Sequence, residues 1–160
     1  MASPLIAGNR LDRMSNKTIE ILTHPKVLKI NQDPLVMQAT RIGYSGAMTT
    51  FTDVYGDPLT RWEQEVWVKP LLRYPGRSYP TPYGFALALV NHATTNVTVT
   101  ADTLAITKAY PKFLSASSAA KFDSEELWSG MSGQDVVVGD KISWEVEPDG
   151  VAVITLDPDC

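Results

Sequence analysis

The stretch ISWEVEPDGVAVITL, residues 142–156, decides the fold class. Its first half alternates, with Ile142, Trp144 and Val146 on one face and polar side chains on the other, which is typical of a half-buried strand. Its second half, residues 151–156, predicts another strand. Pro148-Asp149-Gly150 between them is a turn signal. The stretch therefore predicts two strands separated by a tight turn.

Further strand patterns precede this stretch. Residues 85–90 form a continuous apolar run, as expected of a strand buried on both faces. Residues 96–100 alternate, with Val97 and Val99 on one face. Other strands are predicted at residues 65–70, 127–128 and 136–138. Together the patterns predict a mainly β chain, an antiparallel sandwich of about eight short strands.

Three stretches lack a clear strand pattern and are predicted to be long loops or insertions. They are residues 48–61, 73–83 and 108–123. They are rich in turn residues, in proline, and in Ala and Ser, respectively. Loops of this length are uncommon inside a compact domain.

The first part of the chain has a different pattern. Ser15 suits the N-cap of a helix, because its hydroxyl can accept from an amide of the first turn. Met14 and Ile19 stand at the spacing of a hydrophobic staple. Pro25 ends this helix and suits the start of a second helical turn. We therefore divide the chain into a loop-and-helix segment, residues 1–30, and a β-sandwich domain, residues 31–160.

Composition and charge argue against several classes of protein. The 160 residues carry a formal net charge of −4 and no run of Lys or Arg, which argues against nucleic acid binding. No apolar stretch approaches the roughly 20 residues that span a membrane. Cys160 is the only cysteine, and His24 and His92 lie far apart in sequence. We therefore expect no internal disulfide, no metal site and no cofactor.

Two sequons point to a secretory history. They mark Asn16 and Asn96 as candidate N-glycosylation sites. The first residues lack the charged region of a signal peptide. We therefore expect that this chain has lost its targeting segment.

Three segments, taken in order, carry a family resemblance. Residues 2–9, followed by a helix pattern, precede the sequence NQDPL at residues 31–35, and residues 66–71 follow. This order resembles the melibiase family of glycoside hydrolases, the α-galactosidases and α-N-acetylgalactosaminidases. The most specific part is similar to the family's junction between barrel and C-terminal domain, and it contains Asn31, Gln32, Asp33 and Pro34. A looser similarity at residues 148–152 implies a hairpin.

The resemblance implies both a fold and an activity. It implies the last helical segment of a truncated (β/α)8 barrel followed by a C-terminal sandwich. The intact enzyme would be a retaining glycosidase acting on α-galactoside or α-N-acetylgalactosaminide glycans, lysosomal or secreted, and a homodimer. Retaining glycosidases need two carboxylates about 5–5.5 Å apart. In this family both stand on barrel strands that precede the matching segment. We therefore assign no catalytic, substrate-binding or metal residue to this chain and predict that it is inactive alone.

The chain departs from the family pattern at two places. Asn9-Arg10-Leu11-Asp12 stands where the family has Asn-Asp-Leu-Arg, so the charges are kept but exchanged. Val36 follows NQDPL where Gly is usual. The exchange puts in doubt any salt bridge that the family makes at this segment.

The acidic residues of the chain suit structural or surface roles. Asp33, inside the junction motif, suits an Asx-turn that holds the linker. The other candidates alternate with apolar residues or cluster with other charges and are predicted to lie on solvated faces. They are Glu63, Glu65, Asp123, Glu125, Glu126, Glu145 and Glu147.

The aromatic residues divide into two groups. Trp67, Trp128 and Trp144 lie within strand patterns, which favours the core or a domain interface. Tyr74, Tyr79 and Tyr83 lie in a proline-rich segment and are candidates for an exposed, sugar-stacking surface.

Two functional hypotheses follow. The first is the C-terminal part of an α-galactosidase or α-N-acetylgalactosaminidase, and the alternative is a stand-alone module that binds carbohydrate or protein. A free module needs no barrel helix. The apolar residues of the first segment favour the first hypothesis and predict an exposed apolar patch on the isolated chain. They are Leu5, Ile6, Ile19, Ile21 and Leu22.

Overall fold

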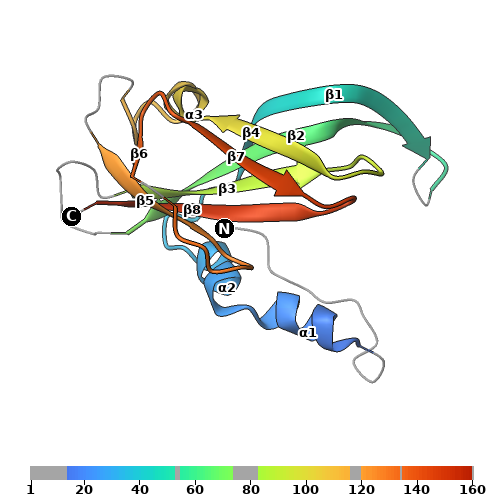
Figure 1. Ribbon diagram of the computed structural model, residues 1–160, viewed down its shortest axis with the longest axis horizontal. Helices are drawn as coiled ribbons and strands as arrows, with labels where there is room; N and C mark the ends of the chain where they lie inside the picture. Colours follow the sequence, from blue (N-terminus) through green and yellow to red (C-terminus); the bar gives the residue numbers. More distant parts are fainter. Residues whose placement is uncertain (1–13, 53–54, 74–82, 116–119, 134, 160) are drawn as a thin grey trace.

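The computed structural model describes residues 14–52, 55–73, 83–115, 120–133 and 135–159. Two antiparallel sheets form two layers, and two helices lie on the far side of the larger sheet (Figure 1). The described part of the chain is therefore a mainly β sandwich preceded by a helical segment, which confirms the predicted fold class.

The helical segment consists of α1 (Asn16–Thr23) and α2 (Pro25–Asn31). Ser15 caps α1, since its Oγ accepts the N–H of Thr18 at 3.1 Å. Pro25 begins α2, where its missing N–H leaves no helical hydrogen bond unmade. The predicted cap and the predicted break at Pro25 are confirmed.

The larger sheet has six strands in the order β1-β2-β3-β8-β5-β6, and all neighbouring pairs are antiparallel. At its centre Val68 of β2 pairs with Leu87 of β3, which pairs with Ile154 of β8. These strands carry apolar side chains because they have neighbours on both sides and the second sheet above them. The six strands are β1 (Thr40–Thr52), β2 (Pro58–Leu72), β3 (Tyr83–Asn91), β5 (Lys121–Glu126), β6 (Val136–Val137) and β8 (Val151–Pro158).

The smaller sheet pairs β4 (Val97–Asp102) with β7 (Lys141–Val146). The helix α3 (Thr103–Ala109) follows β4 directly. Asp102 begins it as an N-cap, because its Oδ1 accepts the N–H of Leu104 at 2.9 Å.

The hydrophobic core lies between the two sheets and beneath α3. Every second residue of the central strands points into it, as the period of two requires. Its fully buried members include Val68, Phe85, Leu87, Leu89, Val99, Ile106, Phe122, Ile154 and Leu156.

The turn at residues 147–150 connects the two layers. β7 pairs with β4 in the small sheet, whereas β8 lies between β3 and β5 in the large one. The N–H of Gly150 donates to the carbonyl of Glu147 at 3.0 Å, and Asp149 has a φ of 50°, which Asp tolerates better than most residues. The two predicted strands are confirmed, but the hairpin is wrong, because the chain changes sheet at this turn.

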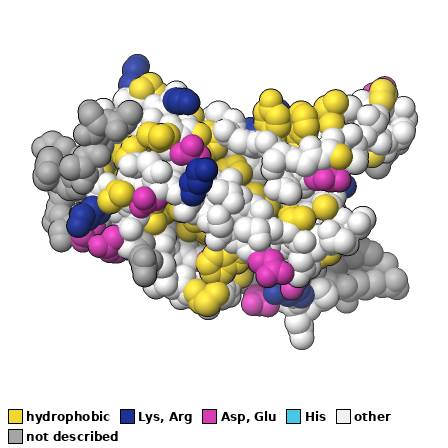
Figure 2. All heavy atoms as spheres, turned by 45° about the horizontal axis from the view of Figure 1, so that its top comes forward, with side chains coloured by type: hydrophobic (Ala, Val, Ile, Leu, Met, Phe, Trp, Pro, Cys, Tyr) yellow, Lys and Arg dark blue, Asp and Glu magenta, His cyan; other side chains and the backbone are white. Residues whose placement is uncertain are grey.

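Strands occupy parts of two predicted loops. Residues 48–61 lie mostly in the hairpin of β1 and β2, where Met48 pairs with Trp62. This ribbon reaches beyond the second sheet (Figure 1), so no buried face imposes an apolar alternation on its sequence. Hydrophobic side chains gather along it (Figure 2), and those that are exposed are Tyr44, Met48, Phe51, Tyr55 and Leu59.

Of the other two predicted loops, one differs from expectation at its ends and the other is mostly untested. Residues 108–123 include the end of α3 and the start of β5. Of residues 73–83, the stretch 74–82 lies outside the described residues. Residues 127–128, predicted as a strand, form a turn that follows β5.

Candidate functional site

The junction between the helical segment and the large sheet is the first candidate site. Lys69 of β2 is buried, and its Nζ donates to the carbonyl of Ile30 at the end of α2, at 2.6 Å. Burial lowers the pKa of Lys69, although the charge of Asp33 opposes this change. A lysine thus joins the two parts of the chain under the helices.

Asp33 fixes the chain where it leaves α2. Its Oδ1 accepts the N–H of Leu35 at 3.0 Å, which is the predicted Asx-turn. Its two oxygens also accept the N–H of Leu72 at 3.0 and 3.2 Å. Within the junction motif Asp33 is buried, whereas Gln32 and Pro34 are exposed. The carboxylate of Asp33 therefore links the end of α2 to the end of β2.

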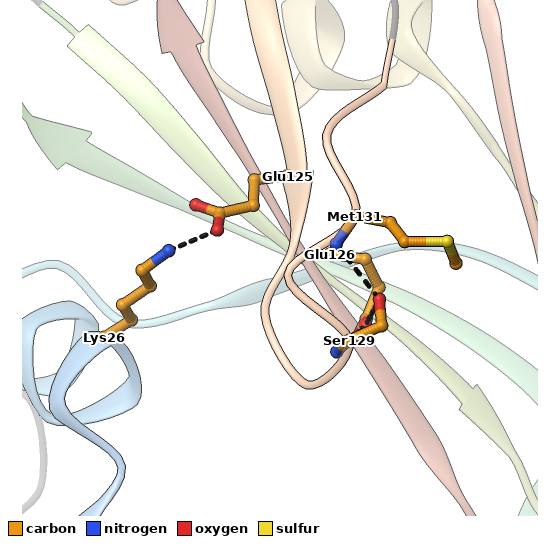
Figure 3. A network of polar contacts seen from close by, with 5 residues as sticks. All are labelled: Lys26, Glu125, Glu126, Ser129 and Met131. Carbon is orange, nitrogen blue, oxygen red and sulfur yellow. Dashed lines mark hydrogen bonds and ion pairs between the residues drawn. The ribbon is translucent and has the colours of Figure 1, made fainter.

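A second link holds α2 against β5 and the turn after it. Lys26 forms an ion pair with Glu125 (Figure 3). The ring of His24 meets that of Trp128 edge-on, with centroids 5.1 Å apart. The Nε1 of Trp128 donates to the carbonyl of Val151 at 3.0 Å. Trp128 therefore lies at the interface of helix and sheet, in a turn.

Glu65 is not on a solvated face, contrary to expectation. Its side chain is only 7% exposed, and it accepts from Nη1 of Arg41 and from Nε1 of Trp67, both at 2.9 Å. Burial raises the pKa of Glu65, but the hydrogen bonds from Trp67 and Arg41 and the charges of Arg41 and His92 lower it below its ordinary value overall. The alternation of β2 predicted the wrong exposure for Glu65, because the side of the sheet that Glu65 faces is covered as well.

Glu126 is also buried, at 3% exposure, where a solvated residue was predicted. Glu125 and Glu126 point to opposite sides of β5 (Figure 3), as neighbours in a strand must. Glu125 therefore faces α2, and Glu126 faces the space between the sheets. The Oε2 of Glu126 accepts two hydrogen bonds from Ser129, one from its backbone N–H at 2.8 Å and one from its hydroxyl group at 2.7 Å.

The other acidic candidates lie at the surface. Asp123, Glu145 and Glu147 are exposed, as predicted. Glu63 is half-buried, and its Oε2 accepts the N–H of Ala47 at 2.9 Å. By contrast, both carboxylate oxygens of Asp33 and both of Glu65 accept hydrogen bonds from donors of the chain itself.

The described residues contain no group of three or more His, Cys, Asp and Glu side chains that could hold a metal ion. No described helix is long and apolar enough to cross a membrane. Asn16 and Asn96, the two sequon residues, are both exposed.

The predicted aromatic surface is placed only in part. Tyr74 and Tyr79 lie outside the described residues. Tyr83 begins β3, and its ring meets that of Phe113 edge-on at 4.6 Å. Trp67 and Trp144 are half-buried, and Trp144 packs against the core.

The sandwich matches a known family. The sequence pattern of the "Alpha galactosidase C-terminal beta sandwich domain" fits residues 62–156, more than half of the chain. The chain belongs to this family. A 41-residue stretch is 58% identical to alpha-galactosidase A of Cellvibrio japonicus and covers 26% of this chain and 10% of that protein.

Solved structures share the fold over nearly the whole chain. The alpha-galactosidase of Saccharomyces cerevisiae superposes with a TM-score of 0.68 at 18% identity, over 99% of this chain and 41% of that one. Alpha-galactosidase I of Mortierella vinacea gives 0.65 at 22% identity, over 97% of this chain and 32% of that one. The chain thus spans less than half the length of these relatives, which are glycosidases by name.

Proposed function

We propose that this chain is the C-terminal part of a retaining α-galactosidase or α-N-acetylgalactosaminidase, and that the catalytic carboxylate pair lies on a barrel outside it. The family match at residues 62–156 carries this proposal. In the intact enzyme the sandwich would support the barrel, and the loop-and-helix segment predicted at residues 1–30 would belong to the barrel.

The outer face of the large sheet supports this role. Ile19 and Ile21 of α1 are each 43% exposed, and no residue of α1 is buried. Trp128, whose ring meets that of His24, adds exposed apolar surface next to the same helices. Exposed apolar side chains on a helix that has no buried residue suit a surface that is covered in the working protein.

The bonding of two of the three buried carboxylates among the described residues supports the absence of a catalytic pair from the sandwich, since only Glu126 keeps an oxygen without a hydrogen bond. A nucleophile in a retaining glycosidase must have an oxygen free to attack the sugar. Asp33 is held by backbone N–H groups, and Glu65 by Arg41 and Trp67. These bonds stabilise the folded chain and leave the two groups engaged.

The test is hydrolysis of chromogenic α-galactoside and α-N-acetylgalactosaminide from acid to neutral pH. We expect no turnover by the chain alone. We expect turnover when the chain replaces the C-terminal sandwich of the S. cerevisiae alpha-galactosidase, compared with that enzyme's barrel without a sandwich. Turnover by the chain alone that is lost in Glu65→Gln or Asp33→Asn would overturn the proposal.

The resemblance further suggests a lysosomal or secreted glycoprotein that forms a homodimer when intact. The exposed positions of Asn16 and Asn96 are compatible with glycan attachment. Sedimentation of the intact enzyme and its cellular fractionation would test the assembly and the location.

A further inference from the structure

A pocket of about 490 Å³ opens at the edge of the sandwich, away from the helices. Its walls come from both layers, β5 and β6 of the large sheet and β7 of the small one. Glu126, Lys141 and Trp144 line it. The volume is in the range of small-molecule sites, about 300–1,000 Å³.

Glu126 has an incomplete set of hydrogen bonds. Its Oε2 is bound twice by Ser129, but its Oε1 is shielded from solvent and has no hydrogen-bond partner among the described residues. A buried polar atom without a partner costs about 1–3 kcal/mol, and more when it is charged. The side chain is 97% buried and lines the pocket, so a donor that enters the pocket would relieve this cost.

The pocket offers polar groups of both kinds beside apolar surface. Lys141 supplies donors, Glu126 and Asp135 supply acceptors, and Trp144 and Ile142 supply apolar area. A sugar hydroxyl both donates and accepts, and the C–H face of a pyranose ring is apolar. The mixture therefore suits a neutral saccharide.

We infer that this pocket is a saccharide-binding site in which a ligand hydroxyl donates to Oε1 of Glu126 and the ring contacts Trp144. Binding there is separate from hydrolysis and does not depend on the proposed glycosidase activity. An ammonium ligand has no acceptor for Lys141, although the carboxylates of Glu126, Asp135 and Asp140 would attract its charge.

The test is titration of the ¹⁵N-labelled chain with D-galactose and raffinose, and separately with butylamine, followed by amide chemical shifts. We expect saturable shifts around Glu126, Lys141 and Trp144 with the sugars. Glu126→Gln should weaken binding about tenfold, as expected when a hydrogen bond to a charged group loses its charge. Glu125→Gln is the matched control, since it is the neighbouring carboxylate on the other side of β5 and should leave binding unchanged.

Asp135→Asn serves as a second variant at an exposed position, where folding is not at risk. It should weaken binding by about threefold. Each of three results would overturn the inference. The first is that the shifts caused by the sugars do not saturate. The second is that Glu126→Gln and Asp135→Asn leave those shifts unchanged. The third is that butylamine, and neither sugar, shifts the amides around Glu126, Lys141 and Trp144.

Discussion

Both oxygens of Asp33 accept the backbone N–H of Leu72, so a single carboxylate joins the end of the helical segment to the end of β2. Asp33→Ala should lower the free energy of unfolding by about 2–3 kcal/mol, because two partly buried backbone N–H groups lose a charged acceptor. Asp33→Asn should cost less, since one amide oxygen can still accept. Urea unfolding of the chain measures both.

The matched control for this experiment is Asp123→Ala, which removes an exposed carboxylate from β5. We expect it to change stability by less than about 0.5 kcal/mol. An equal loss from both alanine variants would contradict a special role for the junction carboxylate.

The ion pair between buried Glu65 and exposed Arg41 should make stability depend on acid pH. The pKa of Glu65 lies below its ordinary value in the folded chain. Such a group makes its full contribution to the free energy of unfolding above the pKa that it has in the unfolded chain. The contribution is lost as pH falls through the pKa that it has in the folded chain. The Tm of Glu65→Gln should be lower than wild type at neutral pH, and the difference should shrink below about pH 4.5.

Glu147→Gln is the control, since Glu147 is exposed at the end of β7. Its Tm curve should follow the wild type across the whole pH range. A constant difference between Glu65→Gln and wild type from neutral to acid pH would show that the charge of Glu65 is not responsible.

The sequence predicted those strands that have a buried face. The alternation of residues 142–146 and the apolar run of residues 85–90 record contact with the core directly. The outer part of the β1–β2 ribbon, within residues 48–61, was missed because most of its residues are exposed, so no alternation was required. The placement of β7 and β8 in different sheets was also beyond local sequence, since the turn at Asp149 is compatible with either a hairpin or a change of sheet.

The roles of the carboxylates were predicted less well, for a related reason. Asp33 could be assigned because an Asx-turn is a local feature. Glu65 depends on Arg41, 24 residues away, and Glu126 on a second layer above β5. Alternation identifies the two faces of a strand but does not tell whether the second face is covered. Lys69 lies between Val68 and Pro70, and this local sequence does not indicate that its Nζ donates to the carbonyl of Ile30.

The two sequons predict glycans at exposed positions. Asn16 begins α1, and Asn96 precedes β4, where its Nδ2 donates to Oε1 of Glu145 at 3.0 Å. Expressed through the secretory pathway of a eukaryotic cell, the chain should lose mass in two steps on enzymatic deglycosylation. Asn16→Gln and Asn96→Gln should each remove one step, and the double variant both. A chain whose mass is unchanged by deglycosylation would contradict this prediction.

The exposed side chains of α1 predict self-association of the chain in the absence of a covering partner. Ile19 and Ile21 are each 43% exposed, and Gln at these positions preserves helix propensity. The double variant Ile19→Gln, Ile21→Gln should weaken the concentration-dependent association seen in sedimentation velocity, with only a small change in Tm, because neither side chain is buried. Leu104→Gln on α3, where Leu104 is 39% exposed, is the control and should not reduce association. An equal effect of Leu104→Gln would mean that general hydrophobicity, and not the helical face, drives the contact.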